Sequence, residues 1–323
     1  MKNIAVLSHN ADIDGVGAAS LLKIKYNIPS NRLFFSGYAK EGILYAEGKL
    51  KKFYGKDFVL FITDLSLNDP TILVWMSLIK RIKAKGGKVF WFDHHPWSEK
   101  AIKKVASLCD VAIVGENAKF CATEITQREM QLDTPFVREF CKVVHYSDFN
   151  IKADTERHRE MVKVYALSIT TWTKSKSNEA IQKKLRHITE VIASRRFTDS
   201  RMTTASRNFE KLNNMRVEKM LAKLTLVGRS IAVGYATGVQ STYACGMVIK
   251  KSGRDIAIVI DPKQGKGSIR SVKSDISGLA KSLSGGGHPH ASGFEIDLKK
   301  YPLNSEAGRT RLMEKISMEA SKL

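Results

Sequence analysis

Acidic and imidazole side chains follow three short apolar runs of this chain. The runs are residues 4–7, 58–63 and 89–92, and each has the composition of a buried strand. Because the carboxyl ends of parallel strands meet at one edge of a sheet, we expect the side chains that follow these runs to lie together. These side chains are His9, Asp12, Asp14, Asp64, Asp93, His94 and His95.

A mixture of carboxylates and imidazoles favours manganese, zinc or iron over magnesium or calcium. Two such cations about 3.5–4 Å apart, sharing one carboxylate, activate water and neutralise a phosphoryl transition state. Each motif alone has a simpler interpretation. The segment from Asp12 to Gly15 also suits a turn that caps a helix, and a lone Asp64 after a strand is more often an N-cap than a ligand. It is their combination that indicates a metal site.

The elements that must position these residues alternate between strand and helix in the first half of the chain. A helix is expected over residues 15–24 and another over 72–79, with further strands at 32–35 and 111–114. Alternation of this kind, with nearly continuous apolar strands, predicts an α/β fold whose parallel sheet is covered on both faces.

Helical patterns then dominate, and the chain divides into two domains joined by a connector. Residues 1–190 are expected to form the catalytic domain, 191–225 a basic helical connector and 226–323 a smaller α/β domain. The helices of the middle region are expected at 136–145, 159–171 and 178–193. In the last domain we expect strands at 231–235, 244–249 and 256–260, and helices at 276–283 and from about residue 307.

Composition and charge limit the classes of molecule that this protein is expected to bind. Of the 323 residues, 43% are hydrophobic, and 53 Lys and Arg against 32 Asp and Glu give a net charge of +21. This excess favours a polyanion, nucleic acid before a membrane surface, although a lysine-rich surface also serves solubility alone. We expect a cytoplasmic protein, because the sequence shows no signal peptide, and no membrane contact, because it has no apolar run of about 20 residues. The cysteines lack paired spacings, so we expect reduced thiols. The sequence indicates no protein partner and leaves a homodimer open.

Several motifs resemble those of the DHH phosphoesterase superfamily. In the first half they are His9-x-x-Asp12-x-Asp14-Gly15, Asp64, Asp93-His94-His95 and Asp148. In the second half, the segment from Ser284 to Gly293 resembles the Gly-Gly-Gly-His signature of the DHH-associated domain, and the segment from Ser268 to Ser271 resembles the strand before it. The resemblance spans most of the chain in the expected order, and is greatest to RecJ-like and nanoRNase-like proteins.

This resemblance implies roles for the motif residues. One metal ion would be held by His9, Asp12 and Asp64, and a second by Asp14, Asp64, His94 and Asp148, with Asp64 as the bridge. His95 would face the substrate phosphate, and Asp93 would orient a neighbouring imidazole. The implied cofactor is two Mn²⁺ ions, with Mg²⁺ or Co²⁺ as substitutes. The implied substrate-binding residues are Arg270, Gly285, Gly286, Gly287 and His288, because an arginine clamps phosphate in a bidentate way and glycines allow close backbone approach.

We therefore expect a metal-dependent hydrolase acting on phosphodiester bonds. The first hypothesis is an exonuclease that releases mononucleotides from single-stranded RNA or DNA, including short oligonucleotides, since a long phosphate backbone gains from distributed cations. The alternatives are a phosphodiesterase for cyclic dinucleotides or pApA, and a scaffold of the same fold that binds nucleic acid or replisome partners without catalysis.

Overall fold

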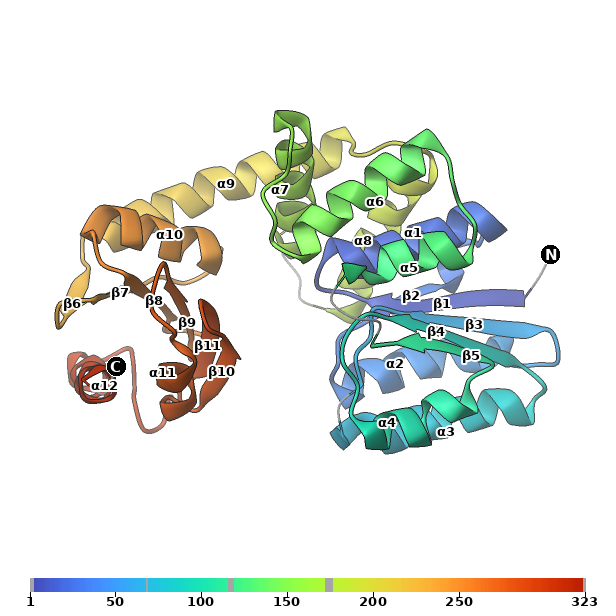
Figure 1. The fold of residues 1–323 in the computed structure, drawn as a ribbon, viewed down its shortest axis with the longest axis horizontal. Coiled ribbons are helices and arrows are strands. Elements are labelled where there is room, and N and C mark those ends of the chain that lie inside the picture. Colours follow the sequence, from blue (N-terminus) through green and yellow to red (C-terminus); the bar gives the residue numbers. More distant parts are fainter. Residues whose placement is uncertain (1–2, 68, 116–118, 172–176, 322–323) are drawn as a thin grey trace. The chain divides into compact units, whose positions relative to one another are not determined.

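The N-terminal unit of the computed structural model contains a five-stranded parallel sheet in the order β2-β1-β3-β4-β5 (Figure 1). The structure describes residues 3–67, 69–115, 119–171 and 177–321. The chain divides into two compact units, residues 1–207 and 208–323. The strands of the first sheet are β1 (Asn3–His9), β2 (Leu33–Ser36), β3 (Phe58–Thr63), β4 (Lys88–Asp93) and β5 (Val111–Val114).

Helices cover both faces of this sheet, as the apolar strands predicted. Successive residues of β1 point to opposite faces, so Ile4 and Val6 join one apolar core while Ala5 and Leu7 join the other. In Figure 1, α2, α3 and α4 lie on one face and α1, α5 and α6 on the other. These helices are α1 (Ile13–Tyr26), α2 (Lys40–Leu50), α3 (Ile72–Ala84), α4 (Glu99–Lys104), α5 (Ala122–Glu129) and α6 (Pro135–Asp148).

The middle of the chain is helical, as expected. It comprises α7 (Glu156–Thr171), α8 (Asn178–Ala193) and α9 (Ser200–Leu221). Helix α8 packs against α1 and β2 and so belongs to the N-terminal unit. The border between the two units falls within α9, which lies inside the stretch predicted as a connector.

The C-terminal unit is built on a mixed sheet in the order β10-β11-β9-β8-β7-β6. Strands β7 and β8 pair in parallel and the other neighbours are antiparallel. Apolar cores lie on both faces, with Ile258 in one and Val259 in the other. The elements are β6 (Thr225–Val227), β7 (Ile231–Tyr235), α10 (Ser241–Ser252), β8 (Ile256–Asp261), β9 (Lys266–Ser271), α11 (Ser277–Ser282), β10 (Gly285–His288), β11 (Ala291–Glu295) and α12 (Glu306–Ala320).

The strand predicted at residues 244–249 is wrong, because this segment belongs to helix α10. Its buried residues Ala244, Cys245 and Val248 have helical spacing, and Gly253 ends the helix with a φ of +68°. The six-residue apolar run resembled a strand because the polar residues that complete the helix lie on either side of it. The fold class is otherwise confirmed.

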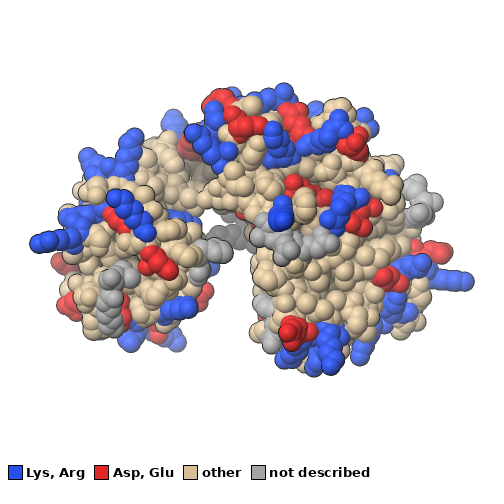
Figure 2. Space-filling view, viewed as in Figure 1, with Lys and Arg blue, Asp and Glu red and all other residues tan. Residues whose placement is uncertain are grey.

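Basic side chains project from the surface of both units in Figure 2. In the described part of the chain, no helix is both long and apolar enough to span a membrane.

Candidate metal centre

The predicted acids and imidazoles of the N-terminal unit come together at the carboxyl edge of its sheet. They come from the ends of β1, β3 and β4, the start of α1 and the end of α6. Three groups have potential ligand atoms within 4.8 Å of one another: His9, Asp12 and Asp64; Asp64, His94 and His95; and Asp14, His94 and Asp148. We call these residues the metal-competent cluster: His9, Asp12, Asp14, Asp64, His94, His95 and Asp148.

Asp12 combines the two interpretations that the sequence left open. It is the N-cap of α1, and its Oδ1 accepts from the backbone N–H groups of Asp14 and Gly15 at 3.2 and 3.3 Å. Its Oδ2 lies 3.1 Å from His9 Nδ1. A carboxylate has two oxygens, so capping the helix leaves one of them for the cluster.

Asp64 occupies the centre of the cluster in a strained backbone conformation. Its φ is +55°, which is uncommon for a residue other than glycine, while its N–H still donates to Phe92 O on β4 at 2.9 Å. The residue is 1% exposed, with Oδ2 3.4 Å from His9 Nδ1 and Oδ1 3.7 Å from His94 Nε2. Asp64 therefore contributes to two of the three ligand groups.

Polar atoms with no hydrogen-bond partner converge at this edge. Among the described residues, His9 Nδ1, Asp64 Oδ2 and His94 Nε2 are buried and make no hydrogen bond. His94 Nε2 also lies 3.7 Å from Asp14 Oδ2 and 3.6 Å from Asp148 Oδ2. Ligand atoms bound about 2.1 Å from one cation are separated by about 3–4 Å, so this spacing fits ligands arranged around an ion. The residues present therefore fit a divalent metal site.

The electrostatics of the cluster also favour a cation. Burial raises the pKa of Asp64 well above its usual range, and the charge of Asp14 adds to the shift. Burial and the charge of Asp14 raise the pKa of Asp148 to about 8. Burial lowers the pKa of His94, which keeps its imidazole neutral and able to bind a metal. A bound cation would offset the repulsion among these acids.

Asp14 is held by the first turn of α5, which the sequence did not reveal. Its carboxylate accepts from Ala122 N and Thr123 N, both at 2.7 Å, and Thr123 Oγ1 donates to its carbonyl at 2.8 Å. The backbone amides at the start of α5 thus bind a carboxylate of the chain itself. Gly17 permits this approach, since a Cβ there would lie 2.5 Å from Thr123 Oγ1.

Asp93 is buried beside the cluster and supports His95. Its Oδ1 lies 2.7 Å from His95 Nδ1, and its Oδ2 accepts from Trp97 Nε1 at 2.7 Å. Burial alone lowers the pKa of His95, but the hydrogen bond and charge of Asp93 outweigh it, so the net shift is upward. Tyr38, another residue that sequence reasoning missed, stacks on the His9 ring with centroids 4.5 Å apart. No spacing in the sequence signals this contact.

The C-terminal signature residues lie on neighbouring strands of the second sheet. Arg270 on β9 pairs with Ala291 on β11, which pairs with His288 on β10. The guanidinium donates to the backbone oxygens of Ile269 and Ser292 and to Thr242 Oγ1, at 2.8–3.3 Å. The side chain of His288 and the exposure of Gly287 lie outside what the structure describes.

The glycines of the signature form a strand. Gly285 to Gly287 belong to β10 at the edge of the sheet. A Cβ on Gly285 would lie 2.0 Å from Gly293 O, whereas a Cβ on Gly286 would meet nothing within 4 Å. Close strand pairing therefore explains the first glycine.

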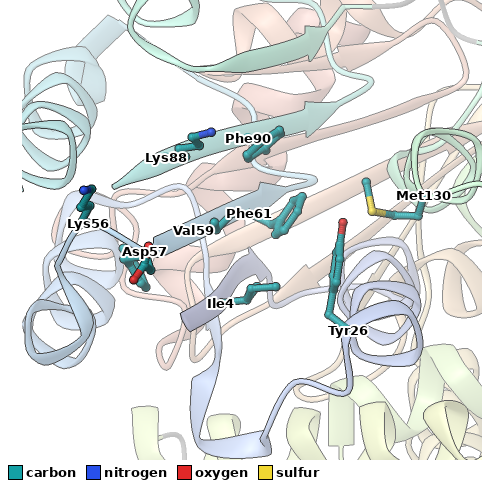
Figure 3. Close-up of a pocket in the computed structure, with 10 residues that line it drawn as sticks. Ile4, Tyr26, Lys56, Asp57, Val59, Phe61, Lys88, Phe90 and Met130 are labelled. Atoms are coloured by element: carbon teal, nitrogen blue, oxygen red, sulfur yellow. The ribbon is translucent and has the colours of Figure 1, made fainter. Parts of the chain in front are cut away.

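A separate cavity of about 650 Å³ lies at the amino ends of the N-terminal strands (Figure 3). Its walls include the stacked rings of Phe61 and Phe90, with centroids 5.1 Å apart, and Lys56 and Lys88 lie at its edge. No residue of the metal-competent cluster lines it. The cavity and the candidate metal centre thus lie at opposite ends of the strands of one sheet.

Comparison with known proteins agrees with this fold. Residues 230–312 match the DHHA1 domain. No curated protein matches the chain. PggH from Vibrio cholerae, a pGpG-specific phosphodiesterase, is 14% identical with a TM-score of 0.54, over 98% of this chain and 99% of that one. RecJ from Thermus thermophilus, solved with Mn²⁺, is 13% identical with a TM-score of 0.57, over 99% of this chain and 52% of that one. The chain thus spans about half the length of RecJ. It therefore carries a C-terminal DHHA1 domain and has the fold of DHH-family proteins, as its motifs indicated.

Proposed function

We propose that this protein is a manganese-dependent phosphodiesterase, acting as an exonuclease that releases mononucleotides from single-stranded RNA or DNA. The observation that carries the proposal is the convergence of three buried, unpartnered atoms, His9 Nδ1, Asp64 Oδ2 and His94 Nε2, among the carboxylates of the cluster. Leaving such atoms unsatisfied costs stability, and two divalent cations sharing Asp64 would satisfy all three.

We assign the ligands to two sets that share Asp64. His9, Asp12 and Asp64 would hold one ion, and the second would be held by the set Asp14, Asp64, His94 and Asp148. Bound divalent cations supply Lewis-acid activation of water and neutralise charge on the phosphoryl group. Imidazole ligands among the carboxylates favour Mn²⁺ over Mg²⁺, with Co²⁺ as a further substitute.

His95 would act on the substrate with Asp93 as its positioning residue. The contact between Asp93 Oδ1 and His95 Nδ1 places a proton on Nδ1 and orients the ring, which leaves Nε2 for the phosphate or the leaving oxygen. The upward net shift of the His95 pKa favours the protonated form, which donates to a departing oxygen.

The net charge of +21 supports a polynucleotide substrate, because each phosphate neutralised by Lys or Arg releases counterions. In the C-terminal unit, we propose Arg270, Gly285, Gly286, Gly287 and His288 as substrate-binding residues. The glycine strand lies at an edge of the sheet, so its unpaired backbone groups are available to a ligand.

A dinucleotide substrate is the second candidate. The similarity in fold to the pGpG-specific phosphodiesterase PggH extends over 99% of that chain, whereas it extends over 52% of RecJ. A two-unit chain of this extent suits hydrolysis of a linear or cyclic dinucleotide as well as the removal of terminal nucleotides. A scaffold without catalysis would not need the complete set of acids and imidazoles found here.

The test is a time course on end-labelled single-stranded RNA and DNA from 2 to about 20 nucleotides, with cyclic dinucleotides included, in Mn²⁺, Mg²⁺ or chelator. We expect stepwise release of mononucleotides from the long strands in Mn²⁺ and none in chelator. Cleavage confined to dinucleotides would replace the exonuclease by the second candidate. Absence of any metal-dependent cleavage would reject both.

A further inference from the structure

A hollow of about 880 Å³ lies within the C-terminal unit, far along its sheet from the glycine signature. Its walls come from the end of α9, the end of β7 and the first half of α12. It is lined by Arg216, Lys219, Met220, Ala222, Lys223, Thr225, Tyr235, Ala236, Thr237, Pro262, Glu306, Arg309, Thr310 and Met313. We call it the cationic groove and define it by Arg216, Lys219, Lys223 and Arg309.

The positively charged side chains that line this groove outnumber the acidic ones. Arg216 and Lys219 are three residues apart on α9 and so share one face, and Lys223 lies just past the end of this helix. Both lysines, Arg216 and Arg309 on α12 line the same hollow. Glu306 is the acidic residue among the lining residues. None of the four cations forms an ion pair with a carboxylate of the described residues. An anion in the hollow would relieve their mutual repulsion.

Two of the four cations are already oriented. Arg216 Nη1 donates to Gly238 O at 2.6 Å, and a Cβ on Gly238 would lie 2.7 Å from that nitrogen. Arg309 Nε donates to Leu303 O at 2.7 Å, and its guanidinium lies 5.6 Å above the centre of the Tyr235 ring. Each arginine keeps further N–H donors for a ligand, so less side-chain entropy is lost when an anion binds.

The groove is distinct from the signature residues of the same domain. The sheet order is β10-β11-β9-β8-β7-β6, with the glycines on β10 at one edge and the groove beside β7 near the other. Arg270 lies on β9 and contacts α10 and β11, and it does not line the groove. The two sites therefore share no residue.

We propose that the cationic groove binds the phosphate backbone of single-stranded nucleic acid, as a second contact apart from the terminal nucleotide. The groove supplies four cationic side chains, two of them pre-oriented arginines, and such charges contact phosphates whatever the base sequence, which suits a backbone contact. That the bound strand is a substrate rests on the proposed function; the binding itself does not.

The double substitution Lys219→Gln with Lys223→Gln tests this proposal. Both side chains are exposed, so the fold is expected to persist, and the thermal midpoint checks this. The matched control is Lys250→Gln with Lys251→Gln, which removes the same charge from exposed positions on α10 outside the groove. Binding of labelled 20-nucleotide single strands is measured by fluorescence anisotropy in chelator, across a range of salt concentrations.

We expect the groove variant to bind the 20-mer roughly tenfold more weakly than the control. Its slope of log affinity against log salt falls by about 1.4 in magnitude, since each lost phosphate contact removes about 0.7. Equal loss in both variants, or loss in neither, overturns the proposal. Because chelator prevents turnover, loss of binding in the groove variant alone supports the groove even if the wild-type protein cleaves no strand. If the wild-type protein cleaves single strands and the groove variant binds the 20-mer as tightly as the control, the groove proposal is rejected and the proposed function stands.

Discussion

The metal-competent cluster and the cationic groove carry opposite charges and are built in different ways. The cluster gathers buried carboxylates whose oxygens are fixed by backbone amides, as Asp14 is fixed by Ala122 and Thr123. The groove gathers exposed side chains, of which two are tethered to carbonyl oxygens. Burying like charges costs folding free energy unless a specific counter-charge binds there. Exposed like charges cost little, and they attract a ligand of opposite charge through their number. Single substitutions should therefore have large effects in the cluster and small ones in the groove.

The largest effect is expected from Asp64→Asn. The amide keeps the size of the side chain but removes the charge shared by two ligand groups, so turnover should fall roughly 10³-fold or more. The matched control is Asp57→Asn, an exposed residue directly before the amino end of β3, where turnover should be unchanged. Steady-state rates at saturating Mn²⁺ and substrate measure both. Comparable rates in the two variants would remove Asp64 from the centre of the chemistry.

The stability of the metal-free protein is expected to fall as pH rises from 5 to 8. The pKa of Asp148 is raised to about 8 against a usual value of 3.8, so in this window the folded chain binds more protons than the unfolded chain. Metal binding needs the ionised acids, and Mn²⁺ at about 100 times its dissociation constant should add about 2.7 kcal/mol at the upper end of the window. Thermal midpoints with and without Mn²⁺ test this. A stabilisation by Mn²⁺ that is the same at pH 5 and pH 8 would contradict it, and Asp148→Asn should weaken the pH dependence.

Gly17→Ala tests whether the backbone support of the cluster matters for stability. The added Cβ would lie 2.5 Å from Thr123 Oγ1 and 3.2 Å from the Phe140 ring, so the free energy of unfolding should fall by about 1–3 kcal/mol. Gly48→Ala, in the last turn of α2 where an added Cβ would meet nothing within 4 Å, is the control and should stabilise by about 0.5–1 kcal/mol. Urea unfolding in chelator compares the two. Changes of the same sign would show that α1 and α5 adjust to the added methyl group.

Arg270→Ala is expected to have the smallest effect on the chemistry. Loss of a bidentate phosphate contact should raise KM about tenfold, or about 1.4 kcal/mol, with little change in kcat. Arg270→Lys restores the charge but not the planar fork, so it should recover part of the loss. If kcat at saturating substrate falls as far as in Asp64→Asn, the division between catalytic cluster and binding domain is wrong.

Much of the candidate site was predictable because it lies at the ends of apolar strands. His9, Asp64 and Asp93 each stand at or just after such a strand, and parallel strands bring their carboxyl ends together. The helix at residues 241–252 was missed because its buried face is short and its central apolar run, residues 244–249, has the composition of a strand. The contact between Asp14 and α5 was also missed, since 108 residues separate Asp14 from Ala122.

The sequence by itself determined the parallel sheet, the acids and imidazoles at its edge, and the order of the motifs, because strand periodicity and residue type are local properties. Only the tertiary structure decided which oxygen of Asp12 caps a helix and which faces His9, that Tyr38 stacks on His9, and that cations from α9 and α12 line one hollow. These contacts join segments distant along the chain, and their geometry depends on how helices pack, which no local pattern specifies.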